Sequence, residues 1–198
     1  MTETRIQRIP STTALPAALR GGVVAIGNFD GVHRGHQAVL ERALDEARRK
    51  NVPALVLTFE PHPRETFRPD TPLFRLTTAP VRARLLDALG FDGVVEQHFD
   101  QEFSACTATE FVERVLLKEL GISHVVTGYD FHFGKGREGT PGFLLEQGNA
   151  RGFGVTLVDA FCDEGSGVIS SSRIRGLLTE GDVTQAAYLG PWLWKLTV

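Results

Sequence analysis

The chain has 198 residues, a formal net charge of −3 and a pI near 6.1, and 42% of its residues are apolar. This length and composition suffice for one domain with its own core. The acidic balance disfavours a nucleic-acid-binding protein, which usually carries a basic face. No segment approaches the ~20 apolar residues of a membrane span, and the N-terminus lacks a signal-like stretch, so we expect a cytoplasmic protein without a membrane partner. The sequence does not indicate an oligomeric state.

Strand-like apolar runs alternate with amphipathic stretches along the chain. The strand-like runs are 23–26, 54–59, 93–98, 124–127 and 154–160, and the amphipathic stretches between them are 36–50, 80–89, 108–120 and 141–151. Thr107 to Glu110 form a capping box before the third stretch, and Gly121 follows its last turn. This alternation predicts an α/β fold with a parallel sheet and helices on both faces. Ligands on such sheets bind beyond the carboxyl ends of the strands.

The remaining features are loops and cysteines. Segments 60–79 and 128–141 are long and polar, the first rich in proline and the second in glycine. Loops of that length in a compact domain are usually functional or mobile. Cys106 and Cys162 have neither the spacing of a metal site nor a disulfide framework around them. We therefore expect both to be small apolar residues.

The densest motif directly follows the run 23–26 and reads Gly27-Asn28-Phe29-Asp30-Gly31-Val32-His33-Arg34-Gly35-His36. A buried strand, a glycine-rich turn and a helix in that order are typical of a phosphate-binding start. The glycines let the backbone approach a ligand, and the first helical N–H groups point at it. His33 and His36 then stand where the charge of that ligand would lie. Each imidazole can donate hydrogen bonds to phosphate oxygens and, when protonated, offset charge that builds on them.

A second candidate anion site is Ile169-Ser170-Ser171-Ser172-Arg173-Ile174-Arg175. The serines are placed as helix N-caps, and the apolar positions begin at Ile174. Arginines in the first turn of such a helix favour an anionic ligand. The alternative is a well-capped surface helix whose arginines are solvated.

Two further motifs lie in the long polar segments. Thr58-Phe59-Glu60-Pro61-His62-Pro63 follows the second strand-like run, and its prolines hold the chain rigid around His62. Gly128-Tyr129-Asp130-Phe131-His132-Phe133-Gly134-Lys135-Gly136-Arg137 combines aromatic rings with a carboxylate and cations. Such rings can stack on a planar ligand. The alternative is a solvated loop that its phenylalanines anchor to the core.

Together these four stretches resemble the FMN adenylyltransferase module of bacterial FAD synthetase, which in that family is fused to a C-terminal riboflavin kinase. The family patterns G-x-F-D-G-V-H-x-G-H, F-E-P-H-P, G-x-D/N-F-x-F-G and I-S-S-T-x-I-R are met in the same order, with the family threonine replaced by Ser172. The resemblance covers residues 20–189 and implies a Rossmann-like nucleotidyltransferase fold. It places the adenylyltransferase domain at 1–189 and, at 190–198, a tail where the kinase domain would otherwise begin.

The resemblance also implies roles for individual residues. His33, His36 and Arg175 would be catalytic, and Asp130 would lie near a magnesium ion that accompanies the substrates ATP and FMN. The residues expected at ATP are Gly27, Phe29, Asp30, Gly35, Ser171, Ser172 and Arg175, and those expected at the flavin are Phe59, His62, Pro63, Phe131 and Phe133.

The implied reaction joins ATP and FMN to give FAD and pyrophosphate. Whether the chain is a stand-alone enzyme or part of a bifunctional one, riboflavin phosphorylation is not expected of it. Two other hypotheses stay open: a nucleotidyltransferase with another phosphorylated acceptor, and a non-catalytic module that binds flavin nucleotides.

Overall fold

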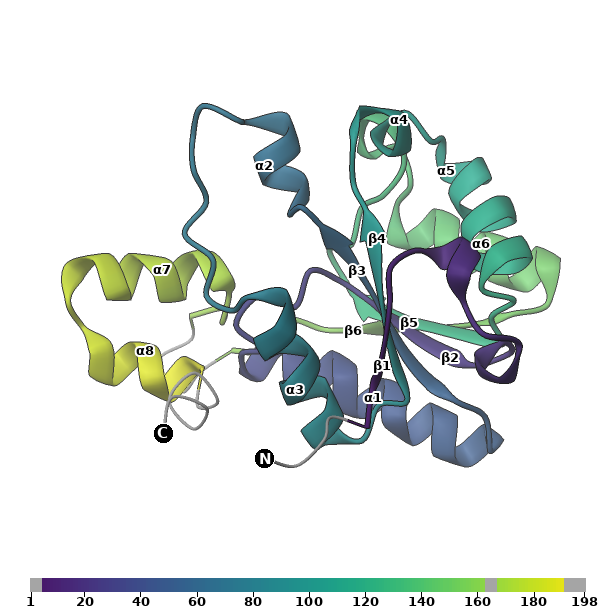
Figure 1. The fold of residues 1–198 in the computed structure, drawn as a ribbon, viewed down its shortest axis with the longest axis horizontal. Helices are drawn as coiled ribbons and strands as arrows, with labels where there is room; N and C mark the ends of the chain where they lie inside the picture. The colour runs from purple at the N-terminus through teal and green to yellow at the C-terminus, as the bar shows by residue number, and fades with distance from the viewer. Residues whose placement is uncertain (1–4, 163–166, 191–198) are drawn as a thin grey trace.

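The structure is a computed structural model that describes residues 5–162 and 167–190. At its centre lies a six-stranded sheet of order β1-β4-β3-β2-β5-β6, in which every neighbouring pair is parallel (Figure 1). The predicted parallel α/β sheet is therefore confirmed, and the runs 23–26 and 93–98 have the expected bounds. The strands are β1 (Gln7–Ile9), β2 (Val23–Ile26), β3 (Ala54–Glu60), β4 (Gly93–His98), β5 (His124–Gly128) and β6 (Gly154–Val158).

Helices cover both faces of the sheet, as predicted. On one face, α1 (Arg34–Lys50) and α3 (Ala79–Leu89) pack their apolar sides on β2, β3 and β4. On the other face lie α5 (Ala108–Glu110), the π-helix η3 (Phe111–Glu119) that continues it, and α6 (Pro141–Arg151). The short 3-10 turns η1 (Thr12–Ala14) and η2 (Ala17–Leu19) add Leu15 and Leu19 to this second core. Burial on both sides explains why β2 is apolar throughout.

The winding of the sheet reverses at β2, because β3 lies on one side of it and β5 on the other. In open α/β sheets the loops that follow two such strands diverge and leave a crevice at the carboxyl ends. Residues 27–33 follow β2, and residues 129–134 follow β5. The topology thus brings two of the four motifs to one crevice.

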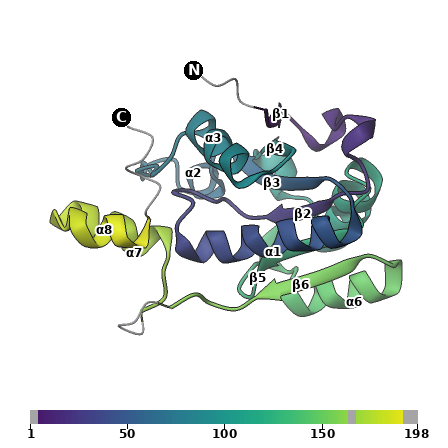
Figure 2. The same cartoon turned by 90° about the horizontal axis from the view of Figure 1, so that it is seen from below.

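The helices α7 (Ser171–Glu180) and α8 (Val183–Leu189) form an arm at the opposite end of the molecule from α6 (Figures 1 and 2). This arm has a small core of its own, made of Ile169, Ile174, Ala186 and Leu189. Leu76 from the segment between β3 and α3 packs against it. The arm is therefore attached to the rest of the molecule partly through that segment.

Four short elements besides the 3-10 turns were not predicted: β1, α2 (Pro63–Phe67), α4 (Gln101–Ser104) and α8. Each is too short to show a hydrophobic period. In addition, α2 begins after His62, whose Nδ1 accepts the N–H of Arg64, and histidine is not a usual helix cap. The predicted domain boundary after residue 189 stays a prediction, because residues 191–198 of the tail lie outside the described residues.

None of the helices within residues 5–162 and 167–190 has the length and hydropathy of a membrane span. Of the two cysteines that we expect to be small apolar residues, Cys106 is buried and Cys162 is exposed. Both thiols are free.

The capping box before η3 is confirmed. The Glu110 N–H donates to Thr107 Oγ1 at 3.1 Å, and the Thr107 N–H donates to Glu110 Oε2 at 2.8 Å. At the other end Gly121 adopts the positive φ (60°) that lets the chain leave the helix.

We expect Thr107→Ala to lower the free energy of unfolding by about 1 kcal/mol, because it removes the cap of this helix. Urea unfolding measures the effect. Thr109→Ala, at an exposed position of the same helix, is the matched control and is expected to change the value by less than about 0.5 kcal/mol. Equal effects of the two substitutions would contradict the assignment of Thr107 as the cap.

Candidate functional site

A cavity of about 1230 Å³ opens at the carboxyl ends of β2, β3, β5 and β6. Its wall also includes the start of α1, the start of α7 and residues of α4 and η3. The four motifs therefore meet around one space. The predicted site residues that line it are Gly27, Phe29, His33, Gly35, His36, Phe59, His62, Pro63, Asp130, Phe131, Phe133, Ser171, Ser172 and Arg175. Asp30 is the predicted residue that the wall does not include.

His33 is the N-cap of α1. Its Nδ1 accepts the backbone N–H of His36 at 3.2 Å, and the two rings stack with centroids 3.6 Å apart. A neutral ring that accepts at Nδ1 carries its hydrogen on Nε2, so His33 keeps one donor for a ligand in the cavity. A Cβ on Gly35 would lie 3.1 Å from the Ile169 carbonyl oxygen, so glycine lets the segment before α7 approach the start of α1.

Both imidazoles are neutral in the ligand-free protein at pH 7. Burial, opposed by the charge of Asp30 and aided by that of Arg175, lowers the pKa of His33 to about 4. Burial and the charges of His33, Arg82 and Arg175 hold the pKa of His36 well below its usual value of 6.5. Before a ligand binds, both rings are therefore neutral hydrogen-bonding groups, and the condition that they be protonated to offset phosphate charge is not met in that state.

The backbone of the turn between β2 and α1 is strained at two non-glycine residues. Phe29 and Val32 have φ values of 49° and 38°, in the left-handed region that side chains disfavour. Both side chains are fully buried, which holds the conformation in place. Such strain costs about 1–3 kcal/mol per residue and is typical of functional turns.

The predicted role of Asp30 as a direct ATP ligand is not supported by its position. Its side chain is only 1% exposed, and its carboxylate accepts the backbone N–H groups of Thr77 at 2.9 Å and Leu76 at 3.2 Å. The same carboxylate forms an ion pair with the guanidinium of Arg175, which does line the cavity. Asp30 therefore positions Arg175 from behind the wall. The sequence alone does not indicate this positioning role of Asp30, because Leu76 and Thr77 lie outside every motif.

The start of α7 is capped as predicted. Ser170 Oγ accepts the N–H of Arg173 at 3.2 Å, and Ser171 Oγ donates to the Asp30 carbonyl at 2.9 Å. Arg175 Nε donates to the Phe74 carbonyl at 2.6 Å. These contacts place Ser172 and Arg175 on the cavity wall beside the positive end of the helix dipole. The surface-helix alternative does not describe this helix, since its first turn faces the cavity.

A further part of the cavity wall is aromatic. Phe131 and Phe133 stack with centroids 5.4 Å apart, but Phe133 is buried while Phe131 is partly exposed. The anchoring alternative thus fits Phe133, and Phe131 is the ring of this pair that a ligand can reach. Sequence reasoning missed Phe99 and Phe103, which pack on Phe59 and line the same wall. Their spacing of four residues after β4 was the available signal.

His62 caps α2 through Nδ1, as His33 caps α1. Burial and the charges of Arg75 and Arg175 lower the pKa of His62 to about 4, against the opposing charges of Asp30 and Glu65. Its ring is therefore neutral at pH 7. A cis peptide bond joins Glu60 to Pro61 just before it.

Asp130 is exposed and lines the cavity, as a metal ligand would. Among the described residues, however, no group of three or more His, Cys, Asp and Glu side chains could hold a metal ion. Mg²⁺ is commonly bound through one or two carboxylates together with substrate phosphates. The donors present thus fit an ion that arrives with a nucleotide and do not fit a protein cage.

The lowered pKa of His33 makes stability depend on pH. Between pH 6.5 and about 4 the unfolded chain takes up a proton at this imidazole that the folded chain excludes, so the free energy of unfolding falls as pH falls. We expect this residue to contribute a loss of about 3 kcal/mol over that range. Urea unfolding of the wild type and of His33→Asn, which keeps a capping oxygen, should show a shallower loss in the variant. Parallel pH profiles would contradict the assignment.

Comparison with known proteins agrees with this geometry. A family model described as FAD synthetase matches residues 15–173. The chain is 41% identical over 173 residues to the bifunctional riboflavin kinase/FMN adenylyltransferase of Escherichia coli (strain K12), with 87% of this chain and 55% of that protein covered. It thus spans about half the length of that relative. A putative bifunctional riboflavin kinase/FMN adenylyltransferase of Geobacillus thermodenitrificans is 37% identical, with 88% of this chain and 92% of that protein covered.

Among solved structures, a protein of Streptococcus pneumoniae described as a macrolide-efflux protein has a TM-score of 0.80 and 28% identity, covering 93% of this chain and 59% of that one. A pantoate-beta-alanine ligase of Francisella tularensis has a TM-score of 0.54 and 11% identity, covering 90% of this chain and 76% of that one, and shows the fold alone. The predicted Rossmann-like nucleotidyltransferase fold is confirmed. With the family model matched over most of its length, the chain belongs to the FAD synthetase family.

Proposed function

We propose that this protein transfers the adenylyl group of ATP to the phosphate of FMN, giving FAD and pyrophosphate. The observation that carries the proposal is the single cavity that joins an anion-binding wall to an aromatic wall. Its volume of about 1230 Å³ exceeds the roughly 300–1,000 Å³ typical of sites for one small ligand, so it has room for two nucleotides. The names of the matched relatives include FMN adenylyltransferase, which supports this assignment.

The anion-binding wall suits the triphosphate of ATP. His33 Nε2 would donate to α-phosphate oxygens, and the rings of His33 and His36 cost little to desolvate because they are neutral. Ser172, Arg175 and the first N–H groups of α7 would hold the leaving pyrophosphate. His33 and Arg175 are held by hydrogen bonds before the ligand arrives, so little reorganisation of these two side chains is needed as charge develops.

The aromatic wall suits the acceptor. Phe131 offers a partly exposed ring, and Phe59 with its neighbours Phe99 and Phe103 provides an apolar surface for an isoalloxazine ring. His62 and Pro63 also line the cavity, where they would contact the FMN. A planar aromatic acceptor fits this wall better than an aliphatic phosphorylated one.

This reaction depends more on how the substrates are positioned than on proton transfer. A phosphate monoester has a second pKa of about 6, so the FMN phosphate is largely a dianion at pH 7 and attacks without a general base. The residues of the cavity would then align this oxygen with the α-phosphorus, opposite the leaving pyrophosphate. Mg²⁺ bound to the ATP phosphates, with Asp130 as its carboxylate ligand, would neutralise developing charge. A cytoplasmic location and small-molecule partners complete the proposal.

The test is chromatography of the products formed by the purified protein with ATP and Mg²⁺, run in parallel with FMN and with riboflavin. We expect FAD from FMN, no product from riboflavin, and no reaction when EDTA removes the metal. His33→Ala and Arg175→Ala should each lower kcat by about 10²–10³, because each removes a donor to the developing charge. Arg151→Ala, at an exposed position of α6 outside the cavity lining, is the matched control.

Full activity in either cavity variant would contradict the residue assignments. If the wild-type protein forms no FAD yet releases pyrophosphate with another phosphorylated acceptor, the choice of FMN is wrong. If it binds FAD tightly without turnover in either direction, it is a binding module and the proposed enzyme activity fails.

A further inference from the structure

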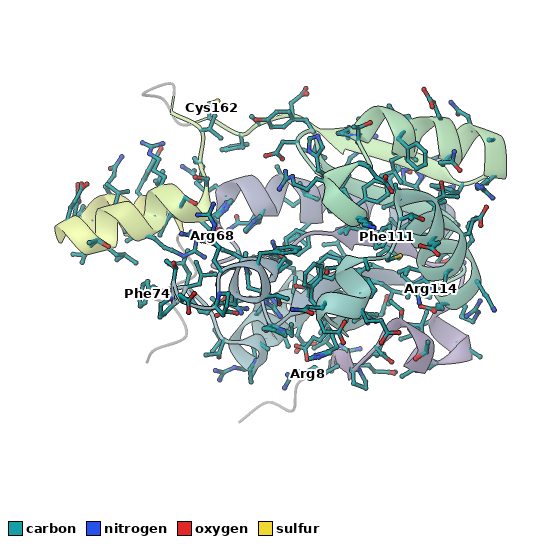
Figure 3. The ribbon with its side chains drawn as sticks, turned by 90° about the horizontal axis from the view of Figure 1, so that it is seen from above. Arg8, Arg68, Phe74, Phe111, Arg114 and Cys162 are labelled. Carbon is teal, nitrogen blue, oxygen red and sulfur yellow. The ribbon has the colours of Figure 1, made fainter. Side chains whose placement is uncertain are left out.

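The segment Phe74–Thr77 lies outside all four motifs and yet contacts both sides of the cavity. On the phosphate side, the Phe74 carbonyl accepts from Arg175, and the N–H groups of Leu76 and Thr77 donate to Asp30. Figure 3 shows Phe74 at the end of the molecule that carries the α7–α8 arm. The segment is thus built into the support of the anion-binding wall.

Arg75, in the middle of this segment, contacts residues on the acceptor side of the cavity. Its guanidinium contacts three carboxylates on three separate elements. The two Nη groups donate to Glu60 at the end of β3, at 2.9 and 3.3 Å, and Nη1 also donates to Glu65 in α2 at 3.2 Å. Its Nε lies 4.0 Å from Asp30 Oδ1. That Nε is buried and has no hydrogen-bond partner among the described residues, and the Asp30 carboxylate lies within ion-pair distance of it.

Two of these carboxylates hold the turn that presents His62 to the cavity. Glu65 Oε2 accepts the backbone N–H of His62 at 2.9 Å. Glu60 directly precedes the turn, and the fully buried Arg82 donates to its Oε1 at 2.6 Å. The third carboxylate, Asp30, holds Arg175 on the phosphate side. Arg75 therefore links the acceptor side of the cavity to the phosphate side without lining the cavity itself.

Charge balance makes this link specific to arginine. The cations Arg75, Arg82 and Arg175 face the anions Asp30, Glu60 and Glu65 in a partly buried cluster. Removal of one cation leaves carboxylates that repel one another in a low-dielectric setting. A lysine carries the charge but cannot make the bidentate contact to Glu60 and reach Glu65 at the same time.

We propose that Arg75 is a positioning residue that sets the geometry of both substrate sites, holding the His62 turn through Glu60 and Glu65 and the Arg175 side chain through Asp30. The inference rests on the proposed function, because it concerns how ATP and FMN are brought into line. It assigns to the segment Phe74–Thr77, between α2 and α3, a role that none of the sequence motifs carries.

The experiment compares the wild type with Arg75→Gln, Arg75→Lys and Arg84→Gln, where Arg84 is an exposed arginine on α3 and serves as the matched control. FAD formation gives kcat and the KM for each substrate, and thermal unfolding reports the fold. We expect Arg75→Gln to raise the KM for both ATP and FMN about tenfold at temperatures where the variant is folded. Arg75→Lys should raise both values less, and Arg84→Gln should match the wild type.

Glu65→Gln tests the acceptor side of the cavity separately from the phosphate side. It removes a contact on the acceptor side alone, so it should raise the KM for FMN and leave the KM for ATP within twofold of the wild type. If Arg75→Gln does not fold, Arg75→Lys and Glu65→Gln decide the question by the same criteria.

A folded Arg75 variant with both KM values within twofold of the wild type, and only a lowered unfolding temperature, would show a purely structural residue and overturn the proposal. A rise confined to one substrate would overturn it too. These outcomes leave the proposed function intact, whereas a wild-type protein that forms no FAD refutes that function and, with it, the inference.

Discussion

The arrangement of the site depends on one buried carboxylate. Asp30 is 1% exposed, and a charge at that depth is tolerated only when hydrogen bonds and a counter-charge satisfy it. The backbone of Leu76 and Thr77 provides the hydrogen bonds, and Arg175 provides the charge. Three segments distant in the sequence, the turn after β2, the approach to α3 and the start of α7, must therefore come together for the chain to fold. The same condition places the arginine of α7 on the cavity wall.

The cavity works by prearranged donors more than by charged side chains of its own. The imidazoles of His33, His36 and His62 are kept neutral by burial and by neighbouring arginines, which lower their pKa values. His33 and His62 each use one ring nitrogen to cap a helix. Each ring is thereby fixed in orientation with its second nitrogen left for a ligand. A phosphoryl-transfer reaction whose nucleophile is already ionised needs this kind of rigid alignment more than it needs an acid or a base.

Sequence reasoning reached the sheet, the helices of both faces and almost all of the wall, because buried strands, amphipathic helices and glycine-rich turns leave local patterns. The cap at Ser170 and the capping box at Thr107 were predictable for the same reason. The role of Asp30 was not, because its partners lie 45 or more residues away in the chain. The link through Arg75 was not, because it joins carboxylates of three separate elements. Histidine caps were also missed, since histidine rarely caps a helix. The buried state of Phe133 and the reachable state of Phe131 follow from packing that no local pattern records.

The central claim is that one cavity holds both nucleotides at once and aligns them for direct transfer. A crystal structure with FMN and an ATP analogue that has a methylene group between its α- and β-phosphorus atoms tests it most directly. The account predicts an FMN phosphate oxygen within about 3.5 Å of the α-phosphorus, opposite the methylene group, with the β- and γ-phosphates at the start of α7. A flavin bound outside the cavity, or an FMN phosphate on the same side as the leaving group, would contradict it.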